Sequence, residues 1–179
     1  MPLPLGHAAV GIATGELAGK KKPAIAWKYY IFVAFLANLP DMDVVIGLLF
    51  NGNGNLFHRG MTHSLLFALV MGFLAAQGWK LWPKLPKISF YIGFLVIFSH
   101  VAADMLFTGS PVSLFWPLEI YRPSEYKGWL DILNVVFFEA SRDAAIIAGS
   151  AIVFFLTRWA RQTLALLTSP AVQTSNEGS

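Results

Sequence analysis

The sequence contains no cysteine and few charged residues. Only 13% of its 179 residues are Asp, Glu, Lys or Arg, whereas soluble domains carry roughly 25%. The absence of cysteine excludes disulfide bonds and thiolate metal ligands, but it assigns no redox compartment. Because 56% of the residues are hydrophobic and the mean hydropathy is +0.58, the composition predicts an integral membrane protein with room for one compact bundle.

The distribution of charged residues argues against a nucleic-acid-binding protein and against a cleavable signal peptide. The net charge of +3 is small, and no basic stripe alternates with aromatic residues, so we expect no nucleic-acid partner. The N-terminus has no basic residue before its apolar run, and His7 interrupts that run. We therefore expect no cleavable signal peptide.

Four apolar stretches are long enough to cross a membrane, which takes about 20 residues. A fifth stretch, residues 4–19, is shorter and glycine-rich, and it is compatible with a tilted span, a re-entrant helix or an interfacial helix. The predicted fold is an all-α polytopic membrane helix bundle with four or five membrane-embedded helices. It forms one domain over residues 1–167, followed by a disordered tail over residues 168–179. The four long stretches are residues 29–50, 64–82, 88–107 and 143–159.

Basic residues indicate the orientation of this bundle. If the chain crosses five times, nine of its 13 basic residues fall on one side, which the positive-inside rule assigns to the cytoplasm. The N-terminus is then outside and the C-terminus inside. The nine residues are Lys20, Lys21, Lys22, Lys28, Lys80, Lys84, Lys87, Arg158 and Arg161.

All four histidines lie in short blocks that also contain three of the five aspartates. Ionisable groups inside apolar segments are costly, so they are rare and usually functional. Imidazole nitrogens mixed with carboxylate oxygens bind zinc, manganese or iron. In the predicted orientation every block falls in the outer half of the bilayer, so we expect one shared metal site. The blocks are Gly6-His7, Pro40-Asp41-Met42-Asp43, His58-Arg-Gly-Met-Thr-His63-Ser64 and His100-Val-Ala-Ala-Asp104.

Two of the blocks depend on helix geometry. His100 and Asp104 are four residues apart on a predicted helix, so they share one face and can bind the same ion. A structural hydrogen-bonded pair is the alternative. Pro40 is expected to break its helix beside Asp41 and Asp43 and to free backbone groups there. A helix-capping role accounts for one of these two aspartates but not for both.

The block from His58 to His63 precedes a long apolar run. Thr62 or Ser64 is a natural N-cap for the helix that follows. The planar guanidinium of Arg59 suits a phosphate or a carboxylate, although an arginine at this depth also anchors lipid headgroups. His63 as a plain interfacial residue is the alternative interpretation.

The segment 108–142 is rich in proline and aromatic residues, which is typical of a lid or of a loop packed on the membrane surface. Glu139, Arg142 and Asp143 are expected to form an ion network at the start of the last helix, and they are left out of the site.

The order of the blocks resembles that of a bacterial inner-membrane family described as metal-dependent hydrolases, one member of which is linked by name to the LexA-controlled SOS response. The resemblance runs from His7 to Pro117, and the block from His58 to Ser64 is its most specific part. It implies a metal site more strongly than it implies hydrolysis.

The order is similar, more weakly, to part of the metal cluster of zinc-dependent phospholipase C and the P1-type nucleases, which are soluble, helical and trinuclear. This similarity implies one zinc bound by Asp41 or Asp43 with three further ligands, and a second bound by His7 with Asp104 bridging. Ligands for a third zinc are missing, because no histidine follows His100. One or two ions are therefore expected. The three further ligands of the first zinc are His63, His100 and Asp104.

The leading hypothesis is a membrane-bound hydrolase that uses zinc, or manganese, on a phosphoester or lipid-linked ester at the outer leaflet of the inner membrane. Two alternatives come from other classes: a metal or proton transporter, and a non-enzymatic membrane module with a structural metal. The oligomeric state stays undetermined. The candidate metal ligands are His7, Asp41, Asp43, His63, His100 and Asp104, and the candidate catalytic residues are Asp41, Asp43, His58 and Arg59.

Overall fold

The computed structural model describes residues 3–19, 26–55, 57–108, 111–120, 128, 130 and 140–168. Within these residues the chain forms six α-helices and one short 3-10 helix, and no β-strand, which confirms the predicted all-α class. The elements are α1 (Pro4–Ala18), α2 (Ala26–Asn38), α3 (Met42–Asn51), η1 (Met61–His63), α4 (Leu65–Leu81), α5 (Phe90–Thr108) and α7 (Ala140–Thr168).

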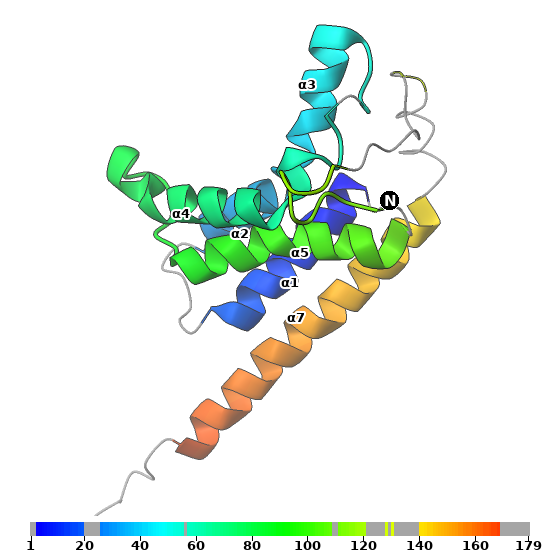
Figure 1. Ribbon diagram of the computed structural model, residues 1–179. Coiled ribbons are helices and arrows are strands. Elements are labelled where there is room, and N and C mark those ends of the chain that lie inside the picture. Colours follow the sequence, from blue (N-terminus) through cyan, green and yellow to red (C-terminus); the bar gives the residue numbers. More distant parts are fainter. Residues whose placement is uncertain are drawn as a thin grey trace, which may run out of the picture.

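Several helices have one end in the same region of the molecule (Figure 1). Helices α1, α4 and α7 begin there, whereas α2 and α5 end there. Helix α1 packs against α2, α5 and α7, and α4 packs against α5. Helix α3 projects away from this end of the bundle. This region is where the histidine and aspartate blocks lie.

The predicted span 29–50 is broken into two helices at Pro40. Helices α2 and α3 are bent by 56° relative to each other. Proline has no N–H to donate, and its ring clashes with the carbonyl one turn earlier, so a regular helix cannot continue through it. The chain instead makes a tight turn, in which the Met42 N–H donates to the Leu39 carbonyl (3.2 Å). The break, which confirms the prediction, places Asp41 directly before α3.

Helices α5 and α7 are each long and apolar enough to cross a membrane, and the bent α2–α3 pair provides a third candidate span. Helices α1 and α4, with 15 and 17 residues, are shorter than the roughly 20 residues of a perpendicular crossing. Helix α7 continues beyond the predicted end at Trp159 to Thr168. The rest of the predicted tail lies outside the described residues.

Small residues let the helices pack closely at the centre of the bundle. A Cβ on Gly72 of α4 would lie 2.7 Å from the Phe94 backbone nitrogen of α5, so these helices meet backbone to backbone. A Cβ on Gly11 of α1 would collide with Ala37 of α2. Such small-residue contacts are typical of helix packing in membranes, where close van der Waals contact drives association. They fix the relative positions of the helices that carry the site.

Candidate metal centre

Every histidine and aspartate predicted as a ligand lies at the shared end of the bundle. All of them are buried except Asp41, whose side chain is 14% exposed. Burying several ionisable groups together is unfavourable unless they are paired or bind a metal. They come from the first turn of α1 (His7), the α2–α3 break (Asp41 and Asp43), the segment leading into α4 (His63) and the second half of α5 (His100 and Asp104), and the candidate catalytic residue His58 lies in the segment leading into α4.

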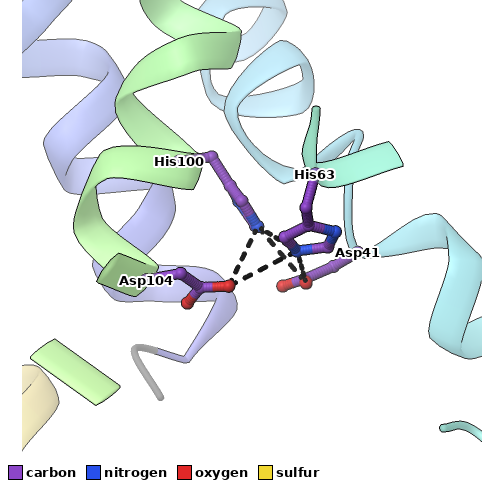
Figure 2. A group of neighbouring side chains, drawn as sticks. All are labelled: Asp41, His63, His100 and Asp104. Carbon is purple, nitrogen blue, oxygen red and sulfur yellow. Dashed lines mark hydrogen bonds and ion pairs between the residues drawn. The ribbon is translucent and has the colours of Figure 1, made fainter. Parts of the chain in front are cut away.

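Four of these side chains point toward one another, as Figure 2 shows. His63 Nε2 is 3.5 Å from Asp41 Oδ1 and 3.4 Å from Asp104 Oδ2. His100 Nε2 is 3.3 Å from the same oxygen of Asp41. Four donors placed roughly 2.0–2.2 Å from a tetrahedral zinc are about 3.3–3.6 Å apart. The spacing therefore suits four ligands around one ion.

The ring of His100 is held with its Nε2 atom toward this group. Its Nδ1 lies 2.7 Å from the backbone oxygen of Ala37 on α2. A carbonyl oxygen only accepts, so Nδ1 carries the proton and donates it. In the neutral ring Nε2 then has a free lone pair, which is the form that binds metals. The packing of α5 on α2 thus selects the tautomer that a ligand needs.

His63 directs its two ring nitrogens to different carboxylates. Its Nε2 faces Asp41 and Asp104, and its Nδ1 lies 3.4 Å from Asp43 Oδ2. Burial lowers the pKa of His63, but hydrogen bonds to Asp104, Asp41 and Asp43 outweigh burial and raise this pKa well above its usual value. The surrounding carboxylates therefore favour positive charge at the centre of the group.

The structure separates the roles of Asp41 and Asp43, which the sequence left open. Asp41 belongs to the four-residue group, whereas Asp43 lies behind His63 and contacts His58 Nδ1 at 3.1 Å. The Thr62 hydroxyl donates to Asp43 Oδ2. A carboxylate behind a ligating histidine commonly orients its ring. Asp43, His58 and His63 also have the spacing of a smaller metal-binding group of their own.

His7 lies on the far side of the carboxylates of Asp41 and Asp104. Its Nε2 is 3.5 Å from Asp104 Oδ1 and 3.9 Å from Asp41 Oδ2. Its ring stacks on that of His100, with 3.7 Å between the centroids. Within the described part of the chain, neither ring nitrogen of His7 has a hydrogen-bond partner. Each carboxylate thus directs one oxygen to His63 and His100 and the other to His7, an arrangement that suits carboxylates bridging two ions.

Arg59 is buried beside the group and has an unusual backbone conformation. Its φ is 59°, in the left-handed region, and its Nε is 4.0 Å from Asp104 Oδ2. Its carbonyl accepts a hydrogen bond from the Ser113 N–H (2.9 Å), and the Leu65 N–H donates to the Leu114 carbonyl (2.9 Å). Residues outside the favoured backbone regions cluster at functional sites. Ser113 and Leu114 therefore pair with the backbone at Arg59 and Leu65, the two ends of the block that contains His63.

Asp143 has a role that the sequence did not reveal. Its carboxylate accepts hydrogen bonds from the Leu3 N–H (2.7 Å) and the Gly6 N–H (3.0 Å), so it caps the N-terminus of α1. A Cβ on Gly6 would collide with this carboxylate, which explains the glycine next to His7. Asp143 thereby fixes the turn that carries His7. The side chains of Glu139 and Arg142, predicted to accompany it, lie outside the described residues.

Comparison with known proteins identifies the family. The model of the YdjM inner membrane protein family matches residues 1–171. The chain belongs to this family. It is also 35% identical over 145 residues to the "Inner membrane protein YbcI" of Escherichia coli (strain K12), which covers 79% of this chain and 81% of that protein. No solved structure matches.

Membership of the YdjM family confirms the predicted bacterial inner-membrane protein. The names of the family and of the relative state a location and no reaction. The hydrolase activity, the bound metal and the periplasmic orientation of the site therefore remain predictions.

Proposed function

We propose that this protein is a membrane-bound, metal-dependent hydrolase that acts on a phosphoester or lipid-linked ester at the outer leaflet. The observation that carries the proposal is the group formed by Asp41, His63, His100 and Asp104, whose donor atoms all lie within 4.8 Å of one another. Two carboxylates this close together, one of them fully buried, are costly in an apolar bundle, and a divalent cation would offset more of that cost than Arg59 and His63 do alone.

The donor set suits zinc, with manganese as the alternative. Two imidazoles and two carboxylates form a mixed nitrogen and oxygen set that both metals accept. The positions of His7 and of the second oxygens of Asp41 and Asp104 suit a second ion. When bound, the metal would lower the pKa of a water ligand to about 7 and polarise a phosphoryl or acyl oxygen.

The remaining polar side chains are placed to bind and orient a substrate. His58 has one ring nitrogen on Asp43 and, among the described atoms, no hydrogen-bond partner for its Nε2. A histidine oriented by a carboxylate in this way can move a proton to or from a reacting group. Arg59 supplies a cation beside Asp104 that suits a phosphate. Asp41, the most exposed member of the group, marks the side from which substrate enters.

The proposed orientation places the site toward the periplasm. The described basic residues Lys28, Lys80, Lys84 and Lys87 lie at the start of α2, the end of α4 and the α4–α5 connection, all at the end of the bundle opposite the site. The positive-inside rule assigns that end to the cytoplasm. An ester at the outer leaflet could then place its polar head at the group while its tail stays in the bilayer.

A hydrolysis assay on purified protein tests the proposal. Detergent-purified protein would be incubated with alkyl phosphates and long-chain esters in the presence of zinc or manganese, and product release would be measured. The His58→Gln variant, which removes the proposed proton carrier but no member of the four-residue group, is expected to lower kcat about 10²- to 10⁴-fold while retaining bound metal. Equal turnover by the wild type and this variant would contradict the proposed role of His58, and absence of turnover on every ester would contradict hydrolysis.

One observation favours a second candidate, the non-enzymatic module with a structural metal. His63, His100 and Asp104 are fully buried, and closed coordination is typical of structural ions. A structural ion would stabilise the fold without turnover, whereas the partial exposure of Asp41 favours access of water and substrate. The transporter stays a prediction that no described feature favours.

A further inference from the structure

An apolar groove runs between α1 and α7, and Phe107 of α5 also lines it. Its volume is about 530 Å³. Most of the lining side chains are aliphatic or aromatic, and the polar ones are the hydroxyls of Thr14 and Ser150. The walls include Val10 and Leu17 of α1, Phe107 of α5, and Ile146 and Val153 of α7.

The groove begins beside the candidate metal centre. Val10 follows His7 by three residues on α1, and Phe107 follows Asp104 by three residues on α5, so both walls start about one helical turn from a ligand. From Val10 to Leu17 the groove follows α1 for about 10 Å. It therefore starts about one helical turn from the buried polar group and extends along α1 between apolar side chains.

The surroundings of the groove select a hydrocarbon occupant. Helix α7, which forms one wall, and α5, which contributes Phe107, are the two unbroken candidate spans, so we expect lipid around the groove. Small residues keep the space open: a Cβ on Gly149 would meet nothing within 4 Å. Water would find almost no hydrogen-bond partners along these walls, whereas an alkyl chain loses nothing on entering from the bilayer.

We propose that this groove binds the hydrocarbon chain of the lipid whose ester group lies at the candidate metal centre. The inference rests on the proposed function and narrows its substrate to a lipid with at least one long chain. The head would lie among the polar side chains at the shared end of the bundle, and the chain would run along α1 and α7 toward Leu17 and Val153. Binding by the groove requires no turnover, so the two proposals can be tested apart.

Photolabelling tests occupancy directly. Hexadecyl phosphate with a diazirine at the chain terminus would be added to the purified protein in nanodiscs. The sample would be irradiated, and the labelled residues would be located by peptide mass spectrometry. Label is expected on α1 and α7 near Leu17 and Val153, and an excess of unlabelled hexadecyl phosphate should compete with it. Label spread evenly over all lipid-facing helices, with no competition, would overturn the proposal.

Gly149→Leu fills the groove and provides the decisive variant, with Ala148→Leu as its matched control. Ala148 is the neighbouring small residue on α7, is exposed, and does not line the groove. Because the leucine side chain would fill the space in which the alkyl chain packs, the chain would lose its van der Waals contacts with the groove walls, and Gly149→Leu should weaken hexadecyl phosphate binding about tenfold or more. Ala148→Leu should leave binding within about twofold of wild type, and so should Gly149→Ala, which adds one methyl group in open space.

The outcomes separate this inference from the proposed function. Weakened binding in Gly149→Leu supports the groove even if no ester is hydrolysed. If Gly149→Leu hydrolysed hexadecyl phosphate as fast as the wild type, the proposal that the groove binds the chain would be overturned, whereas the proposed hydrolase function would stand. Efficient disulfide cross-linking between two copies of a Gly149→Cys variant, in a chain that otherwise has no cysteine, would also overturn it, because a second protein copy would then cover this face.

Discussion

The Nε2 atoms of His63 and His100 lie 3.2 Å apart, although His63 ends η1 and His100 lies on α5. His100 donates its Nδ1–H to the Ala37 carbonyl, so the lone pair of its Nε2 faces the gap between the two rings. Asp41 Oδ1 lies within 3.5 Å of both nitrogens. Two ring nitrogens and a carboxylate oxygen at these distances can bind one metal cation together.

Replacing Asp43 by asparagine should weaken metal binding without abolishing it. Asp43 contacts the ring nitrogen of His63 that faces away from the four-residue group, so it orients a ligand. Loss of such a partner typically lowers metal affinity about 10- to 100-fold. Competition with a chromophoric chelator measures the change, and the stoichiometry at saturating metal should stay unchanged. Glu119→Gln is the control, because the Glu119 carboxylate accepts a hydrogen bond from the Phe115 N–H and does not contact His63. Equal metal affinities of the Asp43→Asn and Glu119→Gln variants would contradict the orienting role of Asp43.

Removing the Asp143 carboxylate should lower both stability and metal affinity. Asp143→Ala leaves the first N–H groups of α1 without their cap, which typically costs about 0.5–2 kcal/mol. His7, the candidate ligand of the second ion, lies in the same helical turn. In Asp143→Ala the second ion should therefore be bound more weakly than the first.

Ser89→Ala is the matched control for the effect on metal. Ser89 accepts from the Ile92 N–H at the start of α5, at the end of the bundle opposite the site, so its loss should cost about 1 kcal/mol and leave metal content unchanged. Ser64 caps α4 by accepting from the Phe67 N–H, which confirms one of the two predicted N-caps, but it follows His63 directly and donates to the Met61 carbonyl of η1. Thermal melting in detergent and metal analysis of both variants make the comparison. An Asp143→Ala protein with wild-type melting and metal content would contradict the capping account.

The orientation in the membrane can be read by cysteine labelling, because the natural chain has no cysteine. Asn51→Cys lies at the exposed end of α3, on the side of the site, and Lys84→Cys lies at the opposite end. In intact spheroplasts an impermeant thiol reagent should label Asn51→Cys only, since the basic end is expected in the cytoplasm. Labelling of Lys84→Cys alone would reverse the assignment.

The grouping of the histidines and aspartates could be predicted because their chemistry stands out from the surrounding sequence. Histidine and aspartate are expensive in apolar segments, and the spacing of His100 and Asp104 places them on one helical face. The break at Pro40 followed from the missing N–H of proline. These local properties can be read without knowing how the helices pack.

Other features depend on packing between distant segments and left no local signal. Asp143 caps a helix 137 or more residues earlier in the chain. The choice between Asp41 and Asp43 depends on how the chain turns at the α2–α3 break relative to η1, and the left-handed conformation of Arg59 depends on the segment around Ser113. Sequence periodicity carries no information about such relationships.

Metal content is the measurement that tests the central claim most directly. Detergent-purified wild-type protein would be analysed by elemental mass spectrometry beside a His63→Ala, His100→Ala double variant, with membrane insertion checked for both. We predict one or two zinc or manganese ions per wild-type chain, loss of metal from the double variant, and normal insertion of each. A wild-type protein that holds no stoichiometric metal after supplementation, or a double variant with the same metal content as the wild type, would contradict the account.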